Sequence, residues 1–256
     1  MSAAAQIALQ NAVNGLLIGG TYATVAVGFS LVWGTLNVVN IAHGALVMLG
    51  AYVTYWLFSL YHIDPLLALP LTGAALFALG YPLQRFVINQ VIRASFLITF
   101  LLTFGLDLLI TNLALAAWTA DIRSVTTSYS GWSLAAGPLA LPVVRIAGLG
   151  IAVLAAGLLH LLMTRSRLGG AIRATASDLE AARLMGIPTA HVYALTFAIA
   201  AATAGIAGGL ILGLLQTYAA WWLGPNFDNI VAFSVLILVL LVRPAGLFGR
   251  ARRFRG

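Results

Sequence analysis

The sequence contains no cysteine and no lysine, and charged residues make up only 7% of its 256 positions. The absence of cysteine excludes disulfides, thiol catalysis and cysteine–metal sites. The absence of lysine excludes a P-loop, whose lysine must reach the nucleotide phosphates, and also excludes Schiff-base chemistry. If ATP drives this protein, a separate chain therefore has to bind the nucleotide.

Apolar residues dominate what is present, since 62% of the chain is hydrophobic and the mean hydropathy is +1.02. A soluble globular domain needs more polar residues than this to cover its surface. Several apolar runs approach or exceed the roughly 20 residues that cross a bilayer as a helix. We therefore predict a single domain, 1–256, with an all-α, polytopic membrane fold of about seven spans. The predicted spans cover residues 9–32, 41–60, 66–83, 94–118, 143–163, 193–216 and 229–242.

The arginines predict the orientation of these spans in the membrane. The net charge of +7 comes from 13 arginines against six acidic residues. When the spans alternate in direction, eleven arginines fall on one side, and only Arg123 and Arg145 fall on the other. Basic residues are retained on the cytoplasmic side of membrane proteins. We therefore predict a multi-pass protein of the cell membrane, with a cytoplasmic C-terminus, a basic cytoplasmic tail at 243–256 and an external N-terminus.

A polar loop at about 165–190 interrupts the apolar runs and, by the arginine pattern, faces the cytoplasm. Ser177 and Glu180 have capping-box spacing at a helix start, where each satisfies a free N–H group. Gly186 suits a left-handed helix end, and Pro188 prevents the helix from continuing. These signals predict a two-turn helix from about Asp178 to Met185. One face of it presents Ala181, Leu184 and Met185.

Two groups of small residues predict close helix contacts. Gly15 and Gly19 form a G-x-x-x-G pair, which allows helices to approach closely in lipid. Packing within this chain and packing against another subunit are both open for this pair. Gly205, Gly209 and Gly213 form a second smooth face, suited to contact with a partner subunit.

Polar residues at membrane depth are the candidates for a substrate pathway. Asn37, Asn40 and His43 lie at a polar break after the first span. They either line a pathway or form an ordinary helix turn at the cytoplasmic interface. No further histidine or carboxylate stands near them at metal-ligand spacing, so we expect no metal site.

Asp107 is the one acidic residue inside a predicted span. An ionised carboxylate in this position is costly and is functional by default. Three roles are open: binding a substrate amino group, bonding to a neighbouring span, or remaining protonated and buried. Thr103, Thr111 and Asn112 are close enough along the helix to satisfy it locally, and a structural role is favoured.

The predicted short helix carries a family motif. Glu180-Ala181-Ala182, three further residues and Gly186 resemble the EAA-x-x-x-G loop of ATP-binding-cassette (ABC) importer permeases, in which a coupling helix docks on the ATPase. The Ile-x-Leu-Pro continuation of that pattern is missing here. The resemblance implies an ATPase-docking surface, whereas a solvated surface helix is the alternative. The residues implied in docking are Glu180, Ala181, Ala182, Arg183, Leu184 and Gly186.

Longer stretches resemble one branch of these permeases, the LivH-type branched-chain amino acid family. The resemblance spans about Gln10 to Gly249, and its clearest segments are 28–44, 165–188 and 240–249. Permeases for urea and short amides share these motifs. It implies the membrane subunit of an importer for branched-chain or related small amino acids, which performs no chemistry and holds no cofactor. Its implied partners are a second, related permease, two ATPase subunits that bind ATP and an extracytoplasmic solute-binding protein.

The chain departs from this family at one place. Ala204 to Gly208 run directly into Gly209 to Gly213, where the family has a loop and another span between comparable segments. The difference is about thirty-odd residues, more than one ~20-residue pass. The shortening leaves open a membrane remnant that does not transport. Independently of it, a stand-alone secondary transporter or channel is the rival to an importer subunit.

Overall fold

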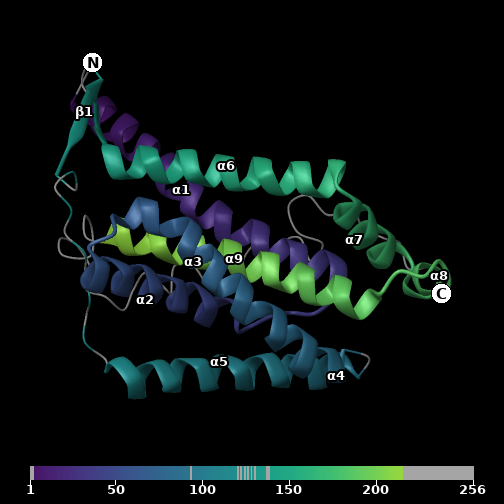
Figure 1. Ribbon diagram of the computed structural model, residues 1–256. Coiled ribbons are helices and arrows are strands. Elements are labelled where there is room, and N and C mark those ends of the chain that lie inside the picture. The colour runs from purple at the N-terminus through teal and green to yellow at the C-terminus, as the bar shows by residue number, and fades with distance from the viewer. Residues whose placement is uncertain are drawn as a thin grey trace. The chain divides into compact units, whose positions relative to one another are not determined.

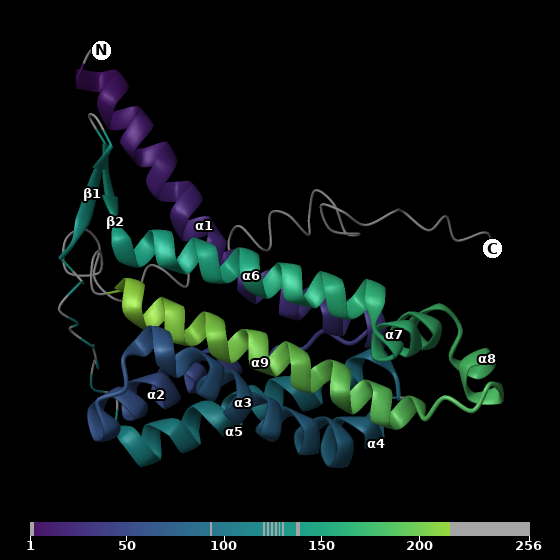
Figure 2. The ribbon, with the colours of Figure 1, turned by 45° about the horizontal axis from the view of Figure 1, so that its top comes forward.

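Figures 1 and 2 show the computed structural model of the chain, in which residues 3–92, 94–119, 121, 123, 125, 127, 129, 131–136 and 139–215 are described. The expected seventh span, Gly249 and the basic tail lie outside these residues. The described elements are α1 (Ala3–Leu36), α2 (His43–Tyr61), α3 (Pro65–Pro82), η1 (Leu83–Ile88), α4 (Asn89–Val91), α5 (Phe96–Trp118), β1 (Ser133–Ala136), β2 (Leu139–Pro142), α6 (Val143–Arg165), α7 (Arg167–Ser177), α8 (Leu179–Leu184) and α9 (Thr189–Leu215).

The predicted helical membrane fold is confirmed. Within the described residues, six helical stretches are long and apolar enough to cross a bilayer, and they correspond to the first six predicted spans. These stretches are Leu9–Leu36, His43–Tyr61, Pro65–Val91, Phe96–Trp118, Val143–Arg165 and Thr189–Leu212.

Helix α9 lies at the centre of this helical unit. In its most apolar stretch 67% of the residues are buried, against 11% in α6. Glycines allow the close approach of its neighbours: a methyl group on Gly50 of α2 would lie 2.5 Å from the Cα atom of Gly205 in α9. A methyl group on Gly205 would lie 2.8 Å from the Leu76 side chain of α3. Figure 2 shows α9 running between α6 and the α2–α3 pair.

The segment after the third span differs from its prediction as a loop. Helix α3 continues through the π-helix η1 and the short α4 to Val91. Gln84 and Ile88 are fully buried. The Gln84 side chain donates to the Asn89 side chain (2.9 Å), which in turn donates to the carbonyl oxygen of Ala190 in α9 (3.0 Å). Gln84 and Asn89 thus bond to each other and to α9, whereas Arg85 is exposed.

Two further elements were not predicted. The loop after α5 contains a hairpin in which β1 pairs antiparallel with β2, with Ser133 opposite Pro142 and Ala136 opposite Leu139. The polar loop after α6 contains α7 in addition to the predicted short helix. Its first residues are held by the Ser166 hydroxyl, which accepts from the Gly169 amide (2.9 Å). Figures 1 and 2 show α4, α7 and α8 at one end of the unit and the hairpin at the other.

Candidate functional site

The predicted short helix is present as α8, at one end of the unit. Its first turn is capped by Asp178, whose carboxylate accepts from the amides of Glu180 and Ala181, both at 3.0 Å. The prediction of a Ser177–Glu180 capping box is therefore wrong by one residue, because Ser177 ends α7 and Asp178 has the extended backbone of a cap. Gly186 has a positive φ of 77°, as predicted for the left-handed end.

The outer face of α8 is unusually exposed for its composition. Leu184 and Met185 are 87% and 81% exposed, and Ala181 is exposed beside them. Large exposed apolar side chains that gather on one short element indicate a surface that contacts another molecule. The inner face is anchored, since Ala182 is buried and Leu179 packs on the core. The helix is thus held rigidly with an apolar face turned outward.

The two charged residues of α8 bond to each other. Arg183 donates to the Glu180 carboxylate at 3.0 Å and to the Thr189 hydroxyl, at the start of α9, at 3.3 Å. The Glu180 side chain is 79% exposed, so this ion pair contributes little to stability. The link to Thr189 connects α8 to the central helix α9.

The polar break between α1 and α2 is a non-helical segment inside the fold. Asn37 is exposed and ends α1 with a positive φ of 54°. Asn40 and His43 are 1% and 4% exposed. The His43 Nε2 atom lies 3.2 Å from the carbonyl oxygen of Val25 in α1. The structure therefore separates Asn37, at the surface, from the two buried side chains.

Helix α5 forms hydrogen bonds with the break and with the first turn of α2. The Thr103 hydroxyl lies 3.0 Å from the carbonyl oxygen of Val39 in the break. One turn further along α5, the Asp107 carboxylate accepts a hydrogen bond from the backbone of Ala45, in the first turn of α2. The first amides of a helix lack partners within the helix, so this carboxylate satisfies one of them. Asn112, expected beside Asp107, bonds instead to the carbonyl oxygen of Leu108.

The two glycine faces differ in whether they contact other parts of this chain. A methyl group added to Gly15 or Gly19 would meet no atom within 4 Å in the described part of the chain. A methyl group on Gly209 would lie 2.6 Å from Leu69 and from the Thr54 hydroxyl. Gly205 and Gly209 therefore pack against α2 and α3 of the same chain, and Gly213 lies on the last turns of α9.

The opposite end of the unit carries a polar contact that the sequence analysis missed. The Tyr129 hydroxyl donates to the Asp64 carboxylate at 2.8 Å, and the same carboxylate caps α3 by accepting from the Leu66 amide at 2.9 Å. Burial, with a smaller contribution from this hydrogen bond, raises the pKa of Tyr129 to about 12. In the sequence, Asp64 followed by Pro65 is the pattern of a helix cap with proline at the first helical position, so the cap of α3 was predictable. The sequence holds no comparable signal for the bond from Tyr129.

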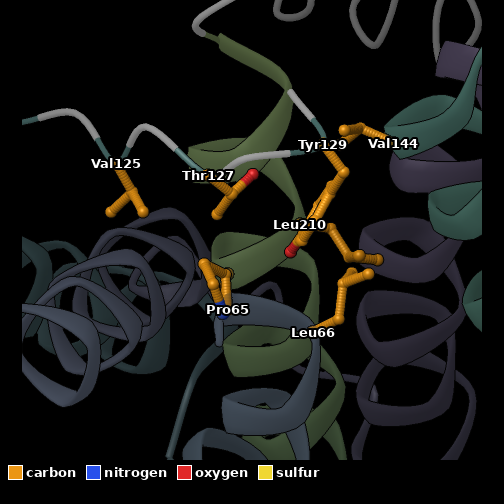
Figure 3. Close-up of a pocket in the computed structure, with 8 residues that line it drawn as sticks. Pro65, Leu66, Val125, Thr127, Tyr129, Val144 and Leu210 are labelled. Atoms are coloured by element: carbon orange, nitrogen blue, oxygen red, sulfur yellow. The ribbon is translucent and has the colours of Figure 1, made fainter. Parts of the chain in front are cut away.

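Figure 3 shows Tyr129 and Thr127 closing a small pocket at this end. Its walls are mostly apolar and come from α3, α6, α9 and the segment between α5 and β1. They are formed by Pro65, Leu66, Val125, Val144, Gly209 and Leu210. The pocket leaves space for about one water-sized molecule. Among the described residues, no group of three histidines, aspartates or glutamates is placed to hold a metal ion.

Comparisons with known proteins agree with this architecture. The family model described as the branched-chain amino acid transport system permease component matches residues 11–249. The chain is 30% identical over 295 aligned positions to the branched-chain amino acid permease protein BraD of Pseudomonas aeruginosa, covering 94% of this chain and 96% of the relative. It is 29% identical to the LivH permease protein of Escherichia coli K12, with the same coverage, and 25% identical to a probable LivH of Methanocaldococcus jannaschii.

The alignment with BraD is 295 positions long although this chain has 256 residues, so the relative contains segments without a counterpart here. This agrees with the expected shortening. No solved structure matched the chain.

Proposed function

The chain belongs to the branched-chain amino acid transport permease family, and from this premise we propose that it is the membrane subunit of an ABC importer for branched-chain amino acids. Its relatives BraD and LivH are described as high-affinity branched-chain amino acid permease proteins. In this role the chain catalyses no reaction and binds no cofactor. Urea or a short amide is the alternative substrate.

The exposed apolar face of α8 is the observation that carries this proposal. A rigid helix that turns Leu184 and Met185 outward fits insertion into a groove of an ATPase subunit. Two such subunits supply the ATP binding that this lysine-free chain lacks. Because Arg183 connects α8 to Thr189, movement of the docked helix is transmitted to the central helix α9.

The remaining partners follow from the other faces of the unit. The open Gly15–Gly19 face of α1 is the proposed contact with a second, related permease. We place the end that carries α7 and α8 in the cytoplasm, since Arg165, Arg167, Arg173 and Arg183 belong to its elements. The other end, with the hairpin, then faces the extracytoplasmic solute-binding protein.

The substrate pathway is proposed to pass the α1–α2 break, with the buried Asn40 and His43 as its polar residues. Transport then proceeds by alternating access: ATP-driven closure of the ATPase pair favours one of two arrangements of the spans. The described spans contain no pair of oppositely charged side chains, a feature that ion-driven transporters use at the membrane midplane. This supports an ATP-driven importer over a stand-alone secondary transporter or channel.

Reconstitution tests the proposal directly. The chain is purified with candidate ATPase, permease and solute-binding subunits and placed in liposomes. We expect leucine uptake that requires ATP and the solute-binding protein, with leucine-stimulated ATP hydrolysis. Uptake of urea in place of leucine identifies the alternative substrate. Uptake driven by an ion gradient without the ATPase, or no uptake by the assembled complex, contradicts the proposal.

Docking is tested in the same complex by cross-linking. Because the chain has no cysteine, Met185→Cys introduces the only thiol on this subunit. We expect Met185→Cys to form a disulfide with a cysteine placed in the ATPase groove. Leu134→Cys, at an exposed position on the hairpin, is the matched control and should form none.

A further inference from the structure

Three polar atoms in the α1–α2 break are buried without a hydrogen-bond partner. They are both amide atoms of Asn40, Oδ1 and Nδ2, and the Nδ1 atom of His43. A buried polar atom left without a partner costs about 1–3 kcal/mol. Three such atoms within four consecutive residues are therefore not explained by the stability of this conformation.

The hydrogen bonds nearby determine what these atoms can bind. Nε2 of His43 lies 3.2 Å from the carbonyl oxygen of Val25, which can only accept. Nε2 therefore carries the proton of the neutral ring, and Nδ1 is left as an acceptor. Together with Oδ1 of Asn40, the break offers two acceptors, and Nδ2 of Asn40 adds a donor. This set matches an N–H donor group such as an ammonium or an amide.

We propose that Asn40 and His43 form a binding site for an N–H donor group of the transported solute, closed in this conformation. The proposal rests on the proposed transport function and assigns the polar part of its pathway to these two residues. Asn37 is left out because it lies at the surface, and Asp107 because it is only partly buried and neither of its oxygens is among the buried atoms without a partner.

The surroundings of the break show how the site is closed. Val38 and Ala42, on either side of Asn40, belong to the buried apolar cluster that includes Ile88 of η1 and Phe197 of α9. Leu179 of the docking helix α8 packs against the same cluster. On the other side, Thr103 of α5 bonds to the Val39 carbonyl oxygen.

This arrangement places the docking helix and the closed site in contact with one apolar cluster. A displacement of α8 therefore changes the packing that covers Asn40. In the open conformation the three polar atoms gain solute or water, and their cost is removed. The unpaired amide thus favours opening and is retained for transport rather than for stability.

The test compares Asn40→Leu with Asn37→Gly in the reconstituted complex. Asn40→Leu removes the unpaired amide at similar volume, and Asn37→Gly removes an amide three residues away at a position whose φ of 54° suits glycine. For Asn40→Leu we expect the KM for leucine to rise at least tenfold, with an unchanged or higher melting temperature. For Asn37→Gly we expect both values to match wild type.

Competition identifies the group that is bound. In the wild-type permease–ATPase complex without the solute-binding protein, whose own selectivity would otherwise decide the outcome, leucine but not 4-methylpentanoate, which lacks the amino group, should displace bound leucine; if the wild-type complex transports urea, urea takes the place of leucine in every arm. A wild-type complex that transports nothing contradicts the proposed function, whatever the variants do. An Asn40→Leu complex that transports with wild-type KM overturns the site itself.

A second variant, Asn40→Ala, keeps the test decisive if Asn40→Leu does not fold. If both Asn40 variants melt well below wild type or do not assemble, the site is also overturned, because the amide would then have stabilising partners in this conformation.

Discussion

The hydroxyl of Thr103 on α5 lies 3.0 Å from the carbonyl oxygen of Val39, 64 residues earlier in the chain. Val39 belongs to the break between α1 and α2, where the carbonyl has no partner within a helix. A buried backbone group must be satisfied somewhere, and inside a membrane water does not supply the bond. This contact joins α5 to the segment that contains the proposed binding site.

Removing that hydroxyl should loosen the break. Thr103→Val keeps the side-chain shape and leaves the Val39 carbonyl with no donor, so we expect a loss of about 1–3 kcal/mol in the free energy of unfolding. Thermal unfolding in detergent, followed by circular dichroism, measures this loss as a lower melting temperature. Thr164→Val is the control, since Thr164 is exposed and bonds only within its own helix. Equal melting temperatures for the two variants would contradict a structural role of the Thr103 bond.

The two glycine faces should respond differently to the same substitution. Gly209→Val places atoms within 2.6 Å of Leu69 and Thr54, so we expect little or no folded protein. The Cβ atom of a side chain at Gly19 would meet no atom within 4 Å in the described part of the chain, so we expect the Gly19→Val subunit to fold. Its effect should appear only in the assembly, as loss of the second permease on size-exclusion chromatography. A Gly19→Val complex of normal size and activity would remove the subunit-contact role of this face.

The cap of α8 should matter for coupling more than for stability. Asp178→Ala removes the side chain that accepts from two amides, and the loss of a helix cap costs about 1 kcal/mol. Gly186→Val forces a β-branched residue to a φ of 77° and should distort the end of the same helix. We expect both variants to hydrolyse ATP with less leucine uptake per ATP. Ser177→Ala is the matched control; an equal loss of coupling in that variant would argue against the Asp178 cap.

The contact between Tyr129 and Asp64 predicts a pH effect in the alkaline range. The pKa of Tyr129 is raised to about 12 in the folded chain, against about 10 for an ordinary tyrosine. The protonated phenol is thus favoured by folding, and its contribution to stability is complete below pH ~10 and lost as the pH rises towards 12. We expect Tyr129→Phe to show a smaller fall in melting temperature than wild type between pH 10 and 12. Tyr61→Phe, at an exposed tyrosine, should follow the wild-type curve.

The long apolar runs made the fold class predictable. A span needs only length and apolar character, both of which are local properties, so six predicted spans match six helical stretches, of which only the third continues well past its predicted end, from Leu83 to Val91. The same holds for α8, whose end is encoded by Gly186 and Pro188. The error at its start, where Asp178 rather than Ser177 is the cap, arose because a continuous α7 occupies Ser177.

The segment at Gln84 to Val91 was predicted as a loop for the opposite reason. The Gln84 side chain donates to Asn89, and Asn89 donates to the backbone of α9, a partner about a hundred positions away. No local pattern contains that information. The hairpin after α5 was missed in the same way, since its strands are four residues long and alternate only weakly in character.

The sequence by itself therefore determined that this chain is a helical membrane protein with a short capped helix after its fifth span, because hydropathy and helix caps act over a few neighbouring residues. The tertiary structure decided which candidates share a site. Asn37, Asn40 and His43 were equal in sequence, yet only Asn40 and His43 are buried with unpaired atoms, because Val38 and Ala42 draw the segment around Asn40 into the apolar core and the His43 ring packs against Phe29 of α1. Three roles were open for Asp107, and its carboxylate accepts from the backbone in the first turn of α2, since adjacent helices bring distant backbone groups within reach.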